Sequence, residues 1–434
     1  MHYLDESHIQ LFLVQLLLLL AVARTLGVAC QRVKIPALAG EILTGVVLGP
    51  TLLGRISPEL QSALFPVEVI QMAMLDTVSW LGVFFLLLSV GFEVDVSRAV
   101  FRQGKKALSV GIVGVLVPIA VGFPVFWFLD DAYHGPKATH LGFTLFLSVA
   151  GSITAISVIA RVLRDLEIVK TDVGTLILSA CAVNDVFGWI LFTFVVALAT
   201  GGTMDPVRGV AALVGVVIFV AICLTVGSYV LRRAAKRVKA TKLPDTPALL
   251  TLITSVGLLC GSATHALGIH AILGFFLAGV MVGSIEEEIT FDQRQALADT
   301  VHAVFVPIFF ATIGIKIDFL AHLDLTITCL FTIVAIGGKL FGAWLGARAV
   351  SIPNRASVFI GSAFTPGGAM EIVVGILALE LGLVSQVTFV GIVFAALLSS
   401  ITVGPLLAWL LRAYGPDVLA LPGGPEAPEQ EASP

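Results

Sequence analysis

The sequence has 434 residues, of which 58% are hydrophobic and only 12% are charged, and its formal net charge is −4. A soluble globular domain usually carries about 25% charged residues, so this composition excludes an ordinary soluble protein. Apolar runs of about 18 or more residues recur from end to end, and each is long enough to cross a bilayer. The sequence therefore predicts an all-α polytopic membrane protein that is embedded in the lipid bilayer.

We predict about thirteen transmembrane helices. In chain order their approximate limits are residues 9–29, 36–54, 75–92, 107–129, 139–163, 172–200, 207–231, 246–266, 269–284, 300–315, 324–350, 355–380 and 385–413. The first span follows Asp5 and Glu6 and has no small-residue cleavage motif, so we expect a retained helix rather than a signal peptide.

The lysines and arginines predict the orientation, because the cytoplasmic loops of membrane proteins are rich in both. With the N-terminus outside, nineteen of the 25 Lys and Arg residues fall on the inner side and only four on the outer side. The inner group includes the basic run at residues 232–242, which we interpret as a cytoplasmic anchor. The sequence therefore predicts a multi-pass protein of the cell (inner) membrane with an outer N-terminus and a cytoplasmic C-terminus.

Two parts of the sequence resemble each other. Gly40, Gly45 and Gly49 each match a glycine 234 residues later, and "LLLSVGFEVD" (86–95) resembles "FFATIGIKID" (309–318). The first copy starts from the inner side and the second from the outer side, so the repeats are inverted. Inverted repeats with broken helices in equivalent places are typical of secondary transporters.

The repeats also predict where helices break and how the chain is divided. "SVAGSITAIS" (148–157) and "SAFTPGGAME" (362–371) both interrupt an apolar span with small, polar or helix-breaking residues. The Pro- and Glu-rich C-terminal end has the composition of a disordered segment. We expect a membrane transport domain at 1–413, with repeat one at about 36–200 and repeat two at about 269–413, and a disordered cytoplasmic tail at 414–434.

"CAVNDVFGW" (181–189) places an amide and a carboxylate inside an apolar span. Asp185 lies about 18 Å into its helix at 1.5 Å per residue, where a charge is costly without a partner, a water-filled cavity or a neutral form. Such a carboxylate can hold either a proton or a monovalent metal cation, and this competition would couple the two. We expect further oxygen ligands from Asn184, Ser152, Thr154 and Ser157. In the alternative interpretation, Asp185 pairs with Lys339 and only locks helices together.

Three other ionisable residues lie inside predicted spans. Lys339 is the obvious cationic partner of Asp185, and it could act either as a titrating group or as a tie between helices. Glu371 follows the "TPGG" break and could line the pathway near the crossing of the broken helices. Glu41 could line the pathway too, or hydrogen-bond to helix ends. We predict these three as pathway residues or charge partners.

Other chemistry finds little support in the sequence. The eight histidines lie in loops or at span ends and nothing in the sequence clusters them, so we interpret them as interfacial residues. The five cysteines have neither metal spacing nor a disulfide pattern. We find no phosphate-binding loop and no hydrolase or zinc-protease motif in a suitable context. We therefore predict no enzyme, no cofactor and no nucleic-acid partner.

Several of these segments together resemble one family. "IPALAGEILTGVVLGPTLLG" (35–54), "LGVFFLLLSVGFEVD" (81–95), "SITAISVIARVLRDL" (152–166), "AVNDVFGW" (182–189) and "IGGKLFGAWLGA" (336–347) are similar to motifs of the monovalent cation:proton antiporters. The resemblance is strongest to the branch of sodium/proton exchangers and Kef-type potassium efflux systems. It covers about residues 10 to 410. Kef-type chains continue into a nucleotide-binding domain, and we expect no such gating here.

This resemblance implies the sodium/proton antiporter fold and an elevator-type homodimer. The core of that fold carries two crossed, broken helices, here within 139–163 and 355–380. Asp185 would be the shared site for the cation and the proton. In this family an Asn-Asp pair such as Asn184 and Asp185 goes with electroneutral exchange.

The leading prediction is exchange of Na⁺ or K⁺ for H⁺. Two alternatives stay open: an uncoupled cation efflux pathway, and an antiporter-like fold reused as a membrane-embedded enzyme or sensor. The second alternative is motivated by two departures from the family pattern. Lys339 neighbours an amide rather than a carboxylate, and Glu371 is displaced from the glycines of its break.

Overall fold

The computed structural model of the chain describes most of the predicted membrane domain. Its described residues are 5–33, 35–94, 104–200, 206–240, 245–267, 269–285 and 287–421. Within these ranges the only β-structure is an isolated bridge between His134 and Val384. The predicted all-α fold class is therefore confirmed.

The elements follow one another as the hydrophobic runs predict. In the first half they are α1 (Glu6–Arg32), α2 (Ala37–Leu48), α3 (Leu53–Ile56), α4 (Pro58–Leu64), α5 (Val69–Gly91), α7 (Gly104–Trp127), η2 (Asp131–Tyr133), α8 (His140–Ala150), α9 (Ile156–Asp165) and α10 (Asp172–Thr200). In the second half they are α11 (Pro206–Ile222), η3 (Cys223–Gly227), α12 (Ser228–Lys239), α13 (Asp245–Ala266), α14 (Ala271–Gly283), α15 (Phe291–Thr300), η4 (Val301–Phe305), α16 (Val306–Lys316), α17 (Leu325–Ala349), α18 (Asn354–Ala363), α19 (Gly368–Glu380), α20 (Gln386–Tyr414) and η5 (Pro416–Leu419).

Over the described part of the chain, ten helices are long and apolar enough to cross a membrane, and a bent pair, α18 and α19, makes up to eleven. Two shorter apolar helices, α8 and α14, complete the set. Each predicted span falls on one or more of these helices, so the count of thirteen is approximately right. Two clear differences are at boundaries. The π-helical turn η3 joins α11 to α12, so that span runs on to Lys239, and η4 joins α15 to α16, so that span begins at Phe291.

The two broken helices lie where the sequence predicts them. The first is α8 and α9, separated by residues 151–155, and the second is α18 and α19, which meet at 49°. Proline lacks a backbone N–H, and Gly368 adopts a φ of +55° that favours glycine, so the TPGG sequence ends the helix there. The breaks touch, because the Ala155 N–H donates to the Pro366 carbonyl at 2.9 Å.

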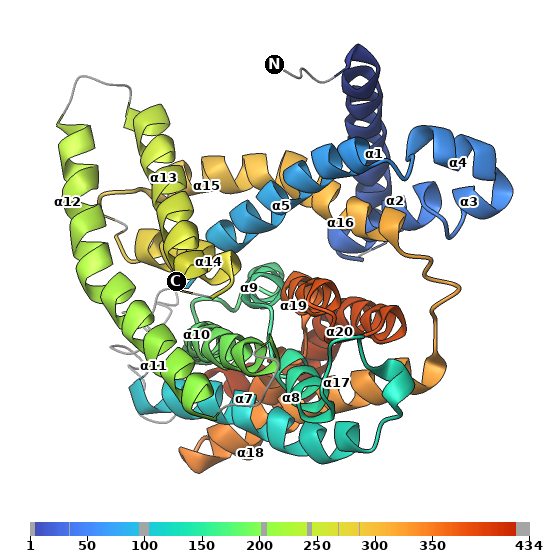
Figure 1. The fold of residues 1–434 in the computed structure, drawn as a ribbon. Coiled ribbons are helices and arrows are strands. Elements are labelled where there is room, and N and C mark those ends of the chain that lie inside the picture. The colour runs from blue at the N-terminus through green and yellow to red at the C-terminus, as the bar shows by residue number, and fades with distance from the viewer. Residues whose placement is uncertain are drawn as a thin grey trace, which may run out of the picture.

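The helices form two groups (Figure 1). The core bundle consists of α7–α10 and α17–α20, which pack mainly on one another and hold both broken helices. The panel consists of α1, α2, α5 and α13–α16, which cross above the core bundle in the view of Figure 1. This division places the breaks within one body and the glycine-rich helices in the other.

Glycines let panel helices meet backbone to backbone. A Cβ atom on Gly45 of α2 would collide with Gly314 of α16, and one on Gly91 of α5 would collide with Gly279 of α14. These two contacts are related by the sequence repeat. Gly45 of the first copy corresponds to Gly279 of the second, and Gly91 of the first corresponds to Gly314 of the second. Each copy of the repeat therefore packs its glycine-rich helix on the following helix of the other copy.

The chain stays packed beyond residue 413. The short helix η5 follows α20, and Val418 and Leu421 are 5% and 6% exposed. The Leu421 N–H lies 3.4 Å from the Asp172 carboxylate at the start of α10. The first residues of the predicted tail are thus ordered, and the remainder, residues 422–434, lies outside the described residues.

Candidate functional site

Asn184 and Asp185 lie in the interior of α10 and are almost completely buried. Their exposed fractions are 0% and 1%. Neither Asp185 oxygen has a hydrogen-bond partner, and neither do the side-chain oxygen and nitrogen of Asn184. A buried polar group without a partner costs free energy, and a buried charge costs more. The pair is thus suited to a ligand, either a proton or a cation, that would satisfy it.

The part of α10 that carries the pair packs against both broken helices. Gly188, one turn after Asp185, lies against the first break, since a Cβ atom placed on it would be 3.6 Å from Ile153. Asn184 lies towards the second break. A Cβ atom on Gly114 of α7 would be 3.7 Å from the Asn184 amide nitrogen and 3.5 Å from the ring of Phe364. The sequence prediction that Asp185 lies beside a broken helix agrees with this packing.

Two of the three predicted hydroxyl ligands lie in the first break, and the third lies on a cavity wall. Ser152 and Thr154 are buried in the first break, where Ser152 donates to Val149 O at 2.7 Å and Thr154 donates to Phe364 O at 3.3 Å. Each keeps oxygen lone pairs that a cation could use, but the Thr154 bond also ties the two breaks together. Ser157 is half-buried in the first turn of α9 and lines a large cavity.

Lys339 is fully buried in α17 and bridges the two broken helices. Its Nζ donates to Ile153 O at 3.2 Å and forms an ion pair with Glu371 at 3.7 Å. The sequence predicts Lys339 as the cationic partner of Asp185, but the carboxylate that it pairs with is that of Glu371, on the first turn of α19. In the alternative interpretation Lys339 locks helices through Asp185, and this is wrong, since Asp185 has no such pair.

Glu371 bends back over its own break. Its carboxylate occupies the space that a side chain on Gly367 would need, and Glu371 is 0% exposed. The displacement of Glu371 from the glycines, noted in the sequence, is therefore what allows it to reach Lys339. Gly367 itself donates its N–H to the Ser399 hydroxyl at 3.2 Å.

A cavity of about 1710 Å³ opens between the core bundle and the panel. It reaches α10 at Ser179 and Ala182, the latter one turn before Asp185, and is lined by Ser157 and by Glu41 of α2. Glu41 thus lies on the cavity wall, where the sequence proposed a pathway residue. Basic residues of α9, Arg161 and Arg164, also line the cavity, although the sequence identified them only as inner-side charges.

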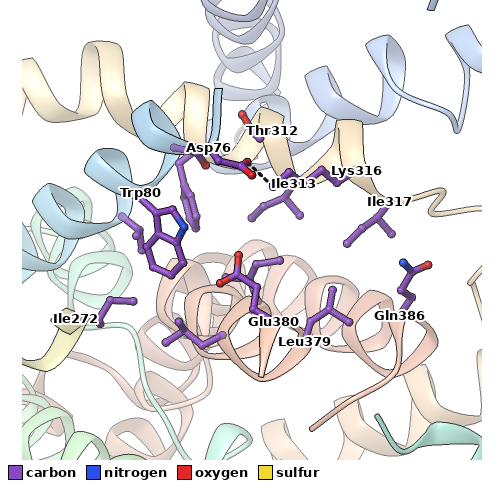
Figure 2. Close-up of a pocket in the computed structure, with 15 residues that line it drawn as sticks. Asp76, Trp80, Ile272, Thr312, Ile313, Lys316, Ile317, Leu379, Glu380 and Gln386 are labelled. Atoms are coloured by element: carbon purple, nitrogen blue, oxygen red, sulfur yellow. Dashed lines mark ion pairs between the residues drawn. The ribbon is translucent and has the colours of Figure 1, made fainter. Parts of the chain in front are cut away.

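A second cavity, of about 220 Å³, lies at the opposite end of the same helices. Along α5 it begins at Asp76, whereas the large cavity begins at Leu86. Figure 2 shows its polar side chains, with Asp76 and Lys316 joined in an ion pair on the panel and Glu380 on the core bundle below them. Two buried rings, Phe309 and Phe310, each line one cavity, and their edge-to-face contact lies between the two spaces.

Sequence reasoning missed the second cavity. Asp76 is visible as a charge near a span end, but Lys316 and Glu380 are separated from it by more than 200 residues. No motif links the three, so only the packing of α5, α16 and α19 brings them together.

The fold and the site define a class of protein. Two broken helices that touch at their breaks, an unpartnered carboxylate on a helix packed against them and cavities at opposite ends of the same helices are features of a secondary transporter. The sequence matches the family described as "Sodium/hydrogen exchanger, transmembrane" over residues 16–413. The chain belongs to this family of membrane transporters, which confirms the family resemblance and the prediction that it is a transporter rather than an enzyme.

Individual relatives agree with this assignment. The chain is 28% identical to the Na⁺/H⁺ antiporter NhaS4 of Synechocystis over 94% of its own length and 99% of that protein. It is 30% identical to cation/H⁺ antiporter 18 of Arabidopsis thaliana and 29% identical to K⁺/H⁺ antiporter 1 of Saccharomyces cerevisiae, over 92% and 93% of its length. It spans about half of each of those two proteins, 48% and 47%.

A solved structure has the same fold. The sodium proton antiporter MjNhaP1 of Methanocaldococcus jannaschii superimposes with a TM-score of 0.68, covering 94% of this chain and 98% of that one. The two sequences are only 14% identical. The fold is therefore retained where most side chains differ, and site roles have to be argued from this chain's own residues.

Proposed function

We propose that this protein exchanges a monovalent cation, Na⁺ or K⁺, for H⁺ across the cell membrane, with Asp185 as the shared site of the cation and the proton. The observation that carries the proposal is the buried Asp185 carboxylate without a hydrogen-bond partner. The protonated form removes its charge, and a bound cation neutralises it, so each ligand excludes the other. Relatives named as Na⁺/H⁺ and K⁺/H⁺ antiporters support this proposal.

The cation would be held by oxygen atoms, the ligands that hard cations prefer. Asn184 offers an amide oxygen, and Ser152, Thr154 and Ser157 offer hydroxyl oxygens in or after the first break. Glu41 and Ser157 on the wall of the large cavity support a route from solvent to this site.

Alternating access would use the two bodies of the fold. With the N-terminus outside, the large cavity faces the cytoplasm and the small one faces outward, so this is an inward-open conformation. The Lys339–Glu371 pair and the bonded breaks hold the core bundle together. An elevator movement of the core bundle along the panel would carry Asp185 from one side to the other. We propose a homodimer on the family resemblance.

The experiment that tests the proposal is a proton-flux assay in reconstituted vesicles with Na⁺, K⁺ and Li⁺ gradients. The wild type is expected to move protons against at least one cation, and Asp185→Asn to lose at least about 99% of the rate, because an amide cannot exchange a proton or neutralise a cation. Asp172→Asn, on the first turn of the same helix, is the matched control and keeps the activity.

Two outcomes contradict the proposal, and a third would make the Asp185→Asn variant uninformative. Exchange by Asp185→Asn at the wild-type rate would remove Asp185 as the site. Cation flux without proton movement in the wild type would favour the uncoupled pathway. Loss of both Asp185→Asn activity and its thermal stability would point to misfolding, which the structure does not predict, because the substitution breaks no hydrogen bond.

A further inference from the structure

The connection between α7 and α8 is firmly fastened to the core bundle. It lies near the start of α17 (Figure 1), where the Tyr133 hydroxyl donates to Asp324 at 3.3 Å. Its backbone bonds to the connection between α19 and α20, with Gly135 N to Leu383 O at 3.2 Å and Lys137 N to Gly382 O at 2.9 Å. Side chains on this segment therefore have a fixed framework.

Three potential metal ligands come together on this segment. Ligand atoms of Asp131, His134 and His140 all lie within 4.8 Å of one another. An Asp131 oxygen is 3.3 Å from Nδ1 of His134 and 3.7 Å from Nδ1 of His140. Zn²⁺ with bonds of about 2.0–2.1 Å in tetrahedral geometry needs neighbouring ligands about 3.3–3.4 Å apart. The two Asp131–histidine distances are already close to this value, and the two histidine nitrogens, which lie within 4.8 Å of each other, would draw together on binding.

The histidine rings are already oriented for this role. Nε2 of His140 lies 2.8 Å from the Trp127 carbonyl, which can only accept a hydrogen bond, so Nε2 carries a proton and Nδ1 is the nitrogen that faces Asp131. A backbone carbonyl that accepts from the other ring nitrogen is a usual partner of metal-binding histidine. The ring of His140 also packs edge-on against Trp127 at 4.5 Å, and His134 packs against Phe143 at 4.1 Å.

We propose that Asp131, His134 and His140 form a binding site for a divalent transition-metal ion of the Zn²⁺ type. Two imidazole nitrogens and one carboxylate oxygen are a ligand set that suits Zn²⁺ and its neighbours rather than Mg²⁺ or Ca²⁺, which prefer oxygen. With three protein ligands, the remaining position is left to water. The interpretation of all eight histidines as separate interfacial residues is wrong for this pair, whose ring centroids lie 5.2 Å apart.

The bound ion would brace both broken helices at one end. His140 begins α8, the first half of the first broken helix, and the connection bonded to this segment follows α19, the last half of the second. The site is separate from Asp185 and binds a resident ion, not the transported one. Because the ion binds the folded state, it is expected to raise the thermal midpoint as its concentration rises.

The test uses the full chain, purified in detergent and freed of metal with a chelator. Calorimetric titration with Zn²⁺ and thermal unfolding are measured for the wild type, Asp131→Asn, His140→Gln and His322→Gln. His322, whose Nδ1 contacts Asp318 O at 2.8 Å, is a histidine outside the cluster and is the matched control. We expect Asp131→Asn and His140→Gln each to weaken Zn²⁺ binding at least about tenfold, with His322→Gln like the wild type.

Bound Co²⁺ gives a second measurement, because its visible spectrum distinguishes four- or five-coordinate from octahedral geometry. The Co²⁺ spectrum of the wild type should be of the lower-coordinate kind and should be lost in both cluster variants. Equal Zn²⁺ affinity in all four proteins would overturn the proposal, and so would an equal stabilisation by Ca²⁺. Should His140→Gln unfold, Asp131→Asn decides, since Asp131 is 88% exposed at its side chain and carries little packing.

Discussion

Two buried polar pairs in the core bundle differ in one respect. Asn184 and Asp185 have neither a side-chain hydrogen-bond partner nor an ion pair. Lys339 donates to Ile153 O and forms an ion pair with Glu371, although neither Glu371 oxygen has a hydrogen-bond partner. All four side chains are no more than 1% exposed. The two pairs are therefore equally buried, but only the second has opposite charges that compensate each other and a bond to a broken helix.

The difference also explains why the membrane interior contains a lysine. A break in a helix frees backbone carbonyls, and Lys339 donates to one of them, while Glu371 neutralises its charge. The ion pair therefore belongs to the architecture of the breaks, and it leaves the Asp185 carboxylate without a cationic partner.

The largest effect is expected when the Lys339–Glu371 ion pair is broken. Lys339→Met leaves Glu371 buried without its cation, which costs about 3–5 kcal/mol, whereas replacing both partners of a buried pair is often close to neutral. Lys339→Met should therefore lower the thermal midpoint of the purified protein clearly, and Lys339→Met with Glu371→Gln should restore most of it.

Lys316→Met is the matched control for this comparison. Lys316 is a partly exposed lysine in an ion pair with Asp76, and such pairs contribute about 0–1 kcal/mol. If Lys339→Met unfolds at the wild-type temperature, or if the double variant is no more stable than the single one, Lys339 and Glu371 do not form a structural unit.

The comparison shows how much could be predicted from sequence. Long apolar runs and the positions of small and helix-breaking residues predicted the spans and both breaks, because burial in a bilayer leaves a strong local signal. Asp185 stands out as a candidate because a charge in such a run is rare. The partner of Lys339 could not be predicted, because the sequence offers two carboxylates, Asp185 and Glu371. Only the folded chain shows that Glu371 bends back over Gly367 and pairs with Lys339.

A smaller effect is expected at the second cavity. Glu380 of the core bundle faces the Asp76–Lys316 pair of the panel (Figure 2). Its attraction to Lys316 exceeds its repulsion from Asp76, and the difference favours this conformation. Glu380→Gln should shift the population towards the opposite conformation by at most about fivefold, because these groups are partly exposed. The apparent affinity for the cation on the outer side should rise by a similar factor in vesicle assays.

Glu59→Gln, an exposed glutamate of α4, controls for a general loss of surface charge. The outer affinity of this control should match the wild type. The same shift in both variants, or in neither, would contradict a role for Glu380 in balancing the two conformations. High salt should reduce the difference between Glu380→Gln and the wild type, since it screens the attraction.

The smallest expected effect concerns the unsatisfied pair and follows from Asn184. The pair holds one carboxylate, so one cation exchanged for one proton moves no net charge. Moving one net charge across a membrane potential of about 100 mV changes the free energy by about 2.3 kcal/mol, which is roughly a fiftyfold change in an equilibrium constant. Exchange by the wild type should nevertheless change by less than about twofold when such a potential is imposed on vesicles with a K⁺ ionophore and Na⁺ as substrate.

Asn184→Asp adds a second carboxylate at the same place, and any exchange that it retains should respond to the potential. A strong response of the wild type would mean that a second titrating group moves with Asp185, and Glu371 and Glu41 would then be the carboxylates to replace next, because one lies beside the second break and the other on the wall of the large cavity.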